Sequence, residues 1–137
     1  MRSFRHANPM TRAVLALLFA VLTFAALPAG AQANRTFPAN ALRGTLLVVA
    51  PPQVKVNGAP ARLAPGARIR TQDNRIVLSA PLIGVELVVN YTLDNQGQVK
   101  DVWILTAAEV ARQPWPATPA QAQAWQFDAA AQTWTRP

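Results

Sequence analysis

Cysteine is absent from the 137-residue chain, and histidine occurs only once, as His6. The chain therefore contains no disulfide, and its fold must be stabilised by packing and by backbone hydrogen bonds. Because thiolate and imidazole ligands are missing, the composition argues against zinc, copper, haem and iron–sulfur sites, and we expect no metal. It also argues against a cysteine nucleophile and a histidine-based catalytic triad.

Motifs that bind nucleotides or build a hydrolase site are missing as well. The six glycines form neither a GxGxxG fingerprint, nor a phosphate-binding loop, nor a GxSxG elbow. We therefore expect no cofactor. Together with the missing nucleophiles, this favours a protein that is not an enzyme.

The first 33 residues have the layout of a secretory signal peptide. Arg2, Arg5 and Arg12 precede an uncharged run of 15 residues, 13–27, and Ala31-Gln32-Ala33 follows as a small-x-small cleavage site. We therefore expect a cleaved segment 1–33 and a periplasmic or secreted protein. An uncleaved inner-membrane anchor carrying a periplasmic domain remains an alternative, although the run is shorter than the ~20 residues that span a bilayer.

Intact-mass analysis of protein recovered from the periplasm is expected to give a chain that begins at Asn34. The reason is that Ala31 and Ala33 fit the small-residue requirement of the signal peptidase. A recovered chain that retains residues 13–27 would instead establish the uncleaved anchor.

Without this segment the chain is moderately basic. The first 33 residues hold three of the 13 basic residues and none of the six acidic ones, so residues 34–137 carry a net charge of +4. Their length suits a single domain with one core. Export removes nucleic acid as a target, so we expect no nucleic-acid partner. Contact with a membrane is expected only through residues 1–33, if these stay uncleaved.

Turn residues divide the exported part into short strands. Pro51-Pro52 ends a continuous apolar run, which predicts a central strand covered on both faces. Asn57-Gly58 predicts a type I′ hairpin turn, and Pro65-Gly66 predicts another turn. Strands are expected at 44–50, 54–56, 59–63, 68–71 and 75–79, followed by a hairpin over 85–106. We therefore predict a mainly β domain over 34–137: a small antiparallel sheet, a sandwich or a partly open barrel of about six strands, with short C-terminal helices.

Three arginines fall close together in this reading. If Asp73-Asn74 is a two-residue loop, Arg68, Arg70 and Arg75 share one face of a hairpin. The opposite, buried face then holds Ile69, Thr71, Ile76 and Leu78. Arginine pairs well with phosphate and carboxylate, so the patch is a candidate binding site for an acidic envelope polymer such as lipopolysaccharide. Alternatively, it is a solvated face that guards against edge-to-edge pairing.

The longest hairpin centres on Asp94-Asn95-Gln96-Gly97, which fits a type I turn followed by a glycine bulge. This turn places Val89 opposite Trp103 on an apolar face, where Asp101 is the one polar residue. A four-residue loop would slip the pairing by one residue and move Trp103 to the other, mixed face.

Asp101 and Glu86 are the candidate catalytic residues. A carboxyl group in apolar surroundings can stay protonated and act as a general acid, but such work needs a positioned partner. The spacing of the acidic residues does not indicate a glycosidase pair. A small carboxylate-dependent hydrolase or lyase acting on an envelope polymer is therefore the alternative function.

Residues 107–137 form a tail rich in tryptophan and proline. Thr106 and Thr118 begin capping boxes, which predict helices over 107–112 and 119–125. Residues 125–135 suggest a small hairpin, although the alanines 129–131 equally allow a helical turn. All four tryptophans lie beyond residue 100. They predict either a stacking platform for sugars or peptides, or a set of anchors that pin the tail onto the sheet. Trp115, between two prolines, is the tryptophan expected to stay partly exposed and to contact a ligand.

Three stretches carry a resemblance: ALRGTLLVVAPP, PARLAPGARIR and WQFDAAAQTWTRP. They resemble small exported proteins of uncharacterised function from proteobacteria, which implies no activity and no site residues. Separately, VNYTLDNQGQVKDVWIL looks like the strand-turn-strand in the C-terminal domain of TonB-like energy transducers. That likeness implies a β-meander and adds periplasmic protein contact to the expected roles.

These observations predict a non-catalytic binding or accessory module of the cell envelope. The expected partner is an envelope protein or an acidic envelope polymer. The ligand and the oligomeric state stay open at this stage.

Overall fold

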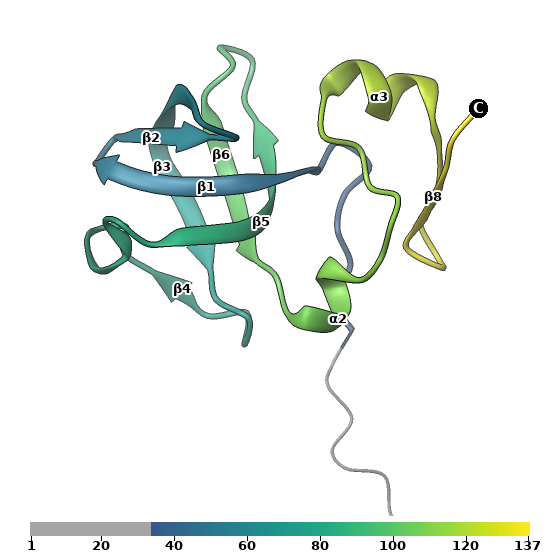
Figure 1. Cartoon of the computed structure of the whole chain (residues 1–137), viewed down its shortest axis with the longest axis horizontal. Coiled ribbons are helices and arrows are strands. Elements are labelled where there is room, and N and C mark those ends of the chain that lie inside the picture. Colours follow the sequence, from purple (N-terminus) through teal and green to yellow (C-terminus); the bar gives the residue numbers. More distant parts are fainter. Residues whose placement is uncertain (1–33) are drawn as a thin grey trace, which may run out of the picture. The chain divides into compact units, whose positions relative to one another are not determined.

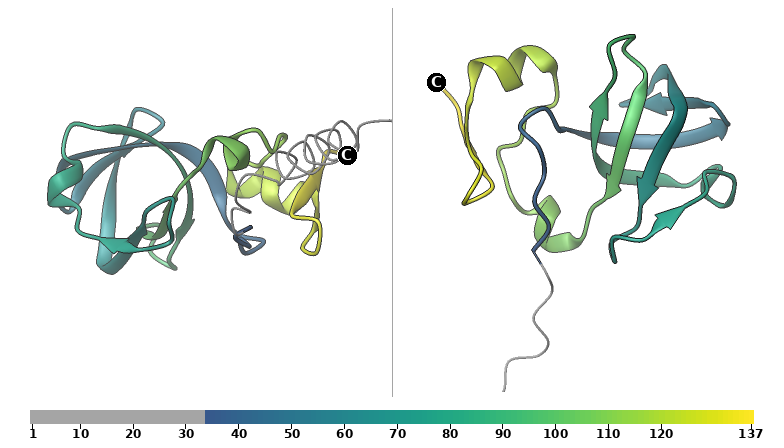
Figure 2. Two further views of the ribbon diagram at one scale, coloured as in Figure 1. Left: turned by 90° about the horizontal axis from the view of Figure 1, so that it is seen from below. Right: turned by 180° about the vertical axis from the view of Figure 1, so that it is seen from behind.

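Six strands form one sheet in the computed structural model, which describes residues 34–137. Their order is β2-β1-β5-β6-β3-β4, and β2 also pairs with β3, so five strands close into a barrel with β4 as an extra strand beside β3 (Figures 1 and 2). The strands are β1 (Leu42–Ala50), β2 (Gln53–Val56), β3 (Ala59–Arg70), β4 (Ile76–Val77), β5 (Glu86–Leu93) and β6 (Val99–Ile104). The predicted mainly β fold is confirmed, in its barrel form. The predicted signal peptide lies outside the described residues.

Three short helices and a second sheet complete the described chain. They are the 3₁₀ helix η1 (Ala80–Leu82), α2 (Ala107–Val110), α3 (Pro119–Ala124) and the antiparallel pair β7 (Gln126–Asp128) and β8 (Thr133–Thr135). The predicted helix starts are confirmed: the Thr106 hydroxyl accepts from the Glu109 N–H, and the Thr118 hydroxyl accepts from the Gln121 N–H. Both helices end one or two residues earlier than predicted.

The barrel is antiparallel except where β3 runs parallel to β6. The start of β1 pairs with β5 and its end with β2, with Leu46 paired to both, so β1 bends across two faces of the barrel. This strand order closes five strands into a small barrel with one parallel pair. That arrangement serves many unrelated functions, so it assigns no ligand.

The alternation of β1 residues decides which face is buried. Leu42, Leu46 and Val48 point into the barrel core, whereas Val49 is 45% exposed. The expectation that both faces of this strand are covered is therefore wrong at its end. Gly44 is required by close packing, because an added Cβ would lie 2.9 Å from the Asn57 side-chain oxygen and 3.2 Å from the Tyr91 ring.

Of the two turns predicted around β3, one forms and the other does not. Asn57 and Gly58 both have positive φ, 52° and 80°, and join β2 to β3 as predicted. Pro65-Gly66 is not a turn: β3 continues through it, and Gly66 (φ 75°) lies where the pairing of β3 with β6 shifts register. The local irregularity curves β3 from β2 towards β6, as closure of a small barrel requires.

The loop between β3 and β4 corrects the predicted arginine hairpin. Thr71 N donates to the carbonyl of Arg75, and Asn74 has φ 64°, so the loop has three residues instead of two. The resulting register pairs Ile69 with Val77 and Arg70 with Ile76. A slip of one residue moves each side chain of a strand to its other face. Ile76 and Leu78, predicted to be buried, are therefore 63% and 77% exposed.

The β5–β6 hairpin has the predicted turn but a different register beyond it. Gly97 has φ 77°, and Leu93 pairs with Val99 as predicted. Lys100 and Asp101 then contribute an extra residue, so Tyr91 pairs with Val102, Asn90 with Trp103 and Val89 with Ile104. This bulge puts Trp103 and Asp101 on the outer face of the barrel, so the predicted pairing of Val89 with Trp103 is wrong.

The tail covers the outer face of the barrel with a second hydrophobic core. This aromatic cluster consists of Phe37, Ala41, Leu105, Trp115 and Trp134, with Trp103, Val110, Ala122, Trp125 and Phe127 packed against it. Trp115 is only 7% exposed, and its ring lies 5.8–6.1 Å from those of Phe37, Phe127 and Trp134. The expectation that Trp115 stays partly exposed is wrong. Trp115 and Trp134 anchor the tail instead.

Candidate functional site

The three predicted arginines do not form a single patch. Arg68 and Arg70 lie on the outer face of β3, opposite Asp101 and Trp103 of β6. The side chain of Arg70 is 21% exposed, makes an ion pair with Asp101 at 3.5 Å and lies 5.7 Å from the Trp103 ring. Arg75 pairs with Thr71, on the other side of the β3–β4 ribbon from Arg70. The free arginine side chains available for a ligand are therefore Arg68 and Arg75, both of which are exposed.

The two candidate catalytic carboxylates are far apart. Asp101 is held by Arg70 and by Thr92, whose hydroxyl donates to the carboxylate at 3.4 Å and accepts from the Asp101 N–H at 3.2 Å. Glu86 is exposed at the start of β5, opposite Leu47 of β1. Six residues of β5 separate Glu86 from Thr92, about 20 Å of extended chain. The two carboxylates therefore do not form an acid–base pair.

Other acidic residues fulfil local structural roles. The Asp94 carboxylate accepts from the backbone N–H groups of Gln96 and Gln98, and that of Asp128 accepts from those of Ala130 and Ala131. Glu109 completes the cap of α2. Within residues 34–137, no three histidine, cysteine or acidic side chains gather as metal ligands. Asp94, Asp128 and Glu109 therefore have structural roles.

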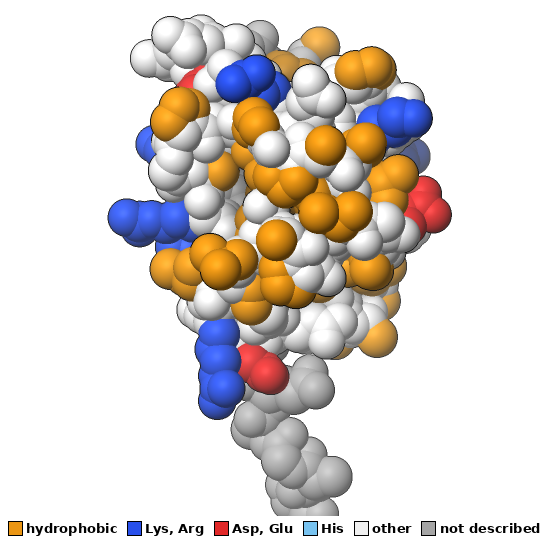
Figure 3. Space-filling model, turned by 90° about the vertical axis from the view of Figure 1, so that its left-hand side faces the viewer, with side chains coloured by type: hydrophobic (Ala, Val, Ile, Leu, Met, Phe, Trp, Pro, Cys, Tyr) orange, Lys and Arg blue, Asp and Glu red, His pale blue; other side chains and the backbone are white. Residues whose placement is uncertain are grey.

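The largest anomaly of the surface is an accumulation of exposed apolar side chains. We call it the apolar patch; in the described part of the chain it comprises Val49, Ile76, Leu78, Ile83, Val85 and Val88, each 43–77% exposed. Figure 3 looks onto the end of the barrel where β1 ends and where η1 and β4 lie, and hydrophobic side chains gather there with Lys and Arg around them. Scattered exposed apolar residues are ordinary, but a gathered set marks an interaction site.

The backbone explains why these residues face outwards. Gly84 N donates to the carbonyl of Val48, and Ile83 forms a bridge with Val48, so the segment after η1 runs along the end of β1. Val77 of β4 and Leu82 of η1 pack against the barrel core. Their neighbours in sequence are thereby turned to the outside, because the core has no further inward positions here.

Comparisons with protein-family models, with curated proteins and with solved structures give no match. The two resemblances noted in the sequence therefore stay predictions. Function must be argued from the surface of this chain alone.

A cleft lies at the other end of β1. An apolar cavity of about 330 Å³ is bordered by Leu42, Leu93 and Ala122 of α3, with Asn40 and Gln123 at its rim. A more polar cavity of about 440 Å³ shares Asn40 and Leu93 with it and extends along the β5–β6 turn. Leu42 begins β1 and Val49 lies near its end, so the cleft and the apolar patch occupy opposite ends of this strand.

Proposed function

We propose that this protein is a non-catalytic binding module of the cell envelope, exported by its N-terminal segment, and that the apolar patch is its binding surface. The observation that carries the proposal is the exposure of six large apolar side chains, together with the hydrophobic side chains that gather at one end of the barrel in Figure 3. Burying such side chains in a complex removes apolar surface from water, which favours association.

The charge near the apolar patch favours an acidic partner. Arg68 and Arg70 share the outer face of the β3–β4 ribbon with Ile76 and Leu78, and Arg70 pairs directly with Ile76. Arg68 is exposed there, and Arg75 is exposed on the other face of the ribbon. Guanidinium groups pair with phosphate and carboxylate. A face whose only role is to prevent strand pairing would use charged residues, and exposing Ile76 and Leu78 defeats that purpose. The arrangement therefore fits recognition of an acidic, partly apolar envelope component.

No observation favours the hydrolase alternative. Asp101 forms an ion pair with Arg70 and a hydrogen bond with Thr92, and Glu86 lies far from it. Hydrolysis of a glycosidic bond uses a pair of carboxyl groups around that bond. We therefore do not propose a catalytic role for either residue.

Sedimentation with an isolated envelope fraction tests the proposal. The parent protein is expected to sediment with the envelope, and the double variant Ile76→Ser/Leu78→Ser is expected to bind at least about tenfold more weakly, because two apolar contacts are lost. Its melting temperature should change little, since exposed substitutions typically cost less than about 0.5 kcal/mol.

A matched control replaces two exposed glutamines outside the apolar patch, Gln96→Ser/Gln123→Ser. This variant is expected to sediment like the parent protein. If the Ile76/Leu78 variant sediments as well as the control, the apolar patch is not the binding surface.

A further inference from the structure

We infer that the partner of the apolar patch is an anionic lipid bilayer, on which the barrel stands with the end that carries β4 and η1. The inference rests on the proposed function and names its partner. It goes beyond the sequence-based expectation, in which only residues 1–33 contact a membrane. Three features support it: the exposure of the patch residues, the basic side chains around them, and the poor fit of a second copy of the chain.

The shape of the site suits a flat, deformable partner. The patch residues come from the end of β1, from β4, from the segment after η1 and from β5. Each of these side chains is 43–77% exposed. Small ligands and peptide side chains are held in concave sites, whereas protruding apolar side chains can enter the boundary between lipid headgroups and acyl chains.

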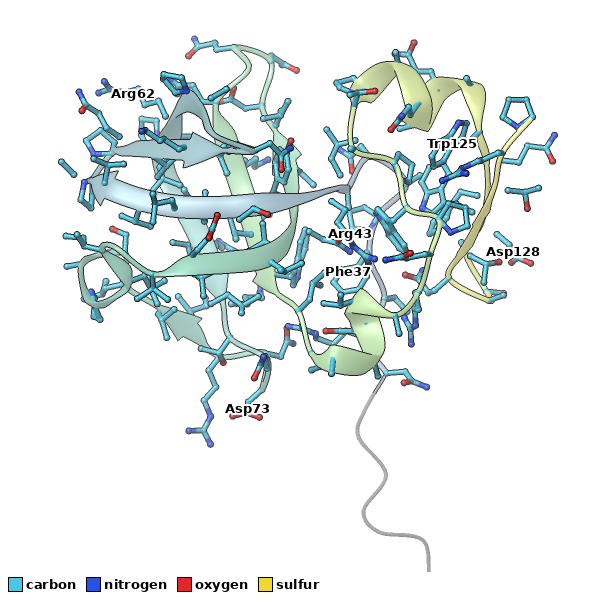
Figure 4. All side chains as sticks on the ribbon, viewed as in Figure 1. Phe37, Arg43, Arg62, Asp73, Trp125 and Asp128 are labelled. Carbon is cyan, nitrogen blue, oxygen red and sulfur yellow. The ribbon has the colours of Figure 1, made fainter. Side chains whose placement is uncertain are left out.

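The charges around the patch suit lipid phosphates. Arg68 lies on the same face as Ile76 and Leu78, and Arg75 is exposed beside Ile76 in the chain, on the other face of the ribbon. Arg62 of β3 is also exposed, at the upper left of Figure 4. Asp73 and Glu86 are the acidic side chains of the adjoining loop and strand, and Asp101, opposite Arg68 on β6, is paired with Arg70. Arg62, Arg68 and Arg75 therefore leave an excess of one basic group. Arginine can lay its apolar stem along a hydrophobic surface while its guanidinium reaches a phosphate. Attachment then combines apolar burial with attraction to anionic lipids.

A second copy of the chain fits this surface less well. A two-fold contact between two patches would bring the basic groups around one patch, such as Arg68, towards those around the other, and like charges disfavour such a contact. Extension of the sheet through β4 is also disfavoured, because β4 has only two residues and offers a short template for strand pairing.

Co-sedimentation with lipid vesicles tests the inference. The parent protein is expected to bind vesicles that contain equal parts of phosphatidylglycerol and phosphatidylcholine, and to bind pure phosphatidylcholine at least tenfold more weakly. The variant Ile76→Ser/Leu78→Ser should lose binding to both, whereas Arg68→Gln/Arg75→Gln should lose the preference for the anionic vesicles and the dependence on salt. The control Lys100→Gln/Arg136→Gln removes the same charge outside the patch and should bind like the parent.

The outcomes separate the lipid partner from the proposed function. Equal binding to both vesicle types, or a Lys100/Arg136 control as weak as the Arg68/Arg75 variant, would overturn the inference. If vesicles are not bound but sedimentation with the envelope fraction still depends on Ile76 and Leu78, the lipid is wrong and the proposed function stands. If neither binds, both fail. A dimer in solution that Ile76→Ser/Leu78→Ser dissociates would identify a second copy as the partner and overturn the lipid.

Discussion

Replacing Trp115 by alanine is expected to lower the free energy of unfolding by about 3–5 kcal/mol. Trp115 lies at the centre of the aromatic cluster, between Phe37, which precedes β1, and Trp134 of β8. Its indole N–H donates to the carbonyl of Ala41 at 3.0 Å. The substitution removes ring contacts, leaves a cavity and deprives a buried carbonyl of its donor. This is a large share of the 5–15 kcal/mol that a domain usually has.

Urea unfolding measures this effect, with Trp125→Ala as the matched control. Trp125 is half-buried at the edge of the same cluster, where the Arg136 guanidinium lies 5.2 Å from its ring. Its truncation should cost clearly less than that of Trp115. Equal midpoints for Trp115→Ala and the parent would show that the tail does not depend on this anchor.

Replacing Arg43 by methionine is expected to cost about 2–4 kcal/mol, because charge-assisted hydrogen bonds to buried acceptors are lost. The Arg43 guanidinium donates to the Asn90 side-chain oxygen and to the carbonyls of Glu109, Val110 and Arg112 at 2.7–3.2 Å. These bonds connect the outer face of the barrel to the end of α2. Methionine retains much of the apolar stem but leaves the carbonyls without this donor.

The matched control is Arg136→Met, which removes an exposed guanidinium that lies over the Trp125 ring. We expect that variant to lose less than about 0.5 kcal/mol in urea unfolding. An equal loss for the two variants would contradict the role assigned to Arg43. Burial lowers the pKa of Arg43 to about 10, so the unfolded chain binds more protons only above that pH. Around neutral pH the Arg43 contribution should therefore not vary.

Local chemistry is what the sequence predicted well. Asn57-Gly58, the turn at Asp94–Gly97 and the hydroxyls of Thr106 and Thr118 all act on backbone groups within a few residues. Their outcome depends little on the rest of the chain. The mainly β class followed from these signals together with the apolar runs, whereas the two strands predicted at 59–63 and 68–71 are one strand, β3.

Register and burial were harder to predict, because they depend on contacts far along the chain. The bulge at Lys100–Asp101 and the extra loop residue at Asn74 each shift a strand by one position. Each shift reverses the faces of the residues beyond it, which explains the errors for Trp103, Ile76 and Leu78. The exposure of Trp115 was predicted from the two prolines next to it in sequence. The residues that bury its side chain, Phe37 and Trp134, lie far from it in the sequence.

The candidate site was found only in part for the same reason. Sequence reasoning assigns apolar residues to the core by default, so Ile76 and Leu78 were placed inside. Arg68 and Arg75 were correctly singled out as accessible cations, but not as neighbours of exposed apolar side chains. Only the observed register places Arg68 and Arg70 on one face with Ile76 and Leu78, and Arg75 on the other.

The central claim is that the end of the barrel carrying the apolar patch enters an anionic bilayer while the opposite end stays in water. The chain lacks cysteine, so single-cysteine variants can be labelled without background. The direct measurement attaches an environment-sensitive fluorophore at Leu78→Cys in the patch and, separately, at Asn95→Cys beside the cleft. On phosphatidylglycerol vesicles we predict a blue shift and quenching by lipid-borne quenchers at position 78, and neither change at position 95. Vesicle-bound protein whose label at position 78 stays in water, or whose label at position 95 enters the lipid, would contradict the account.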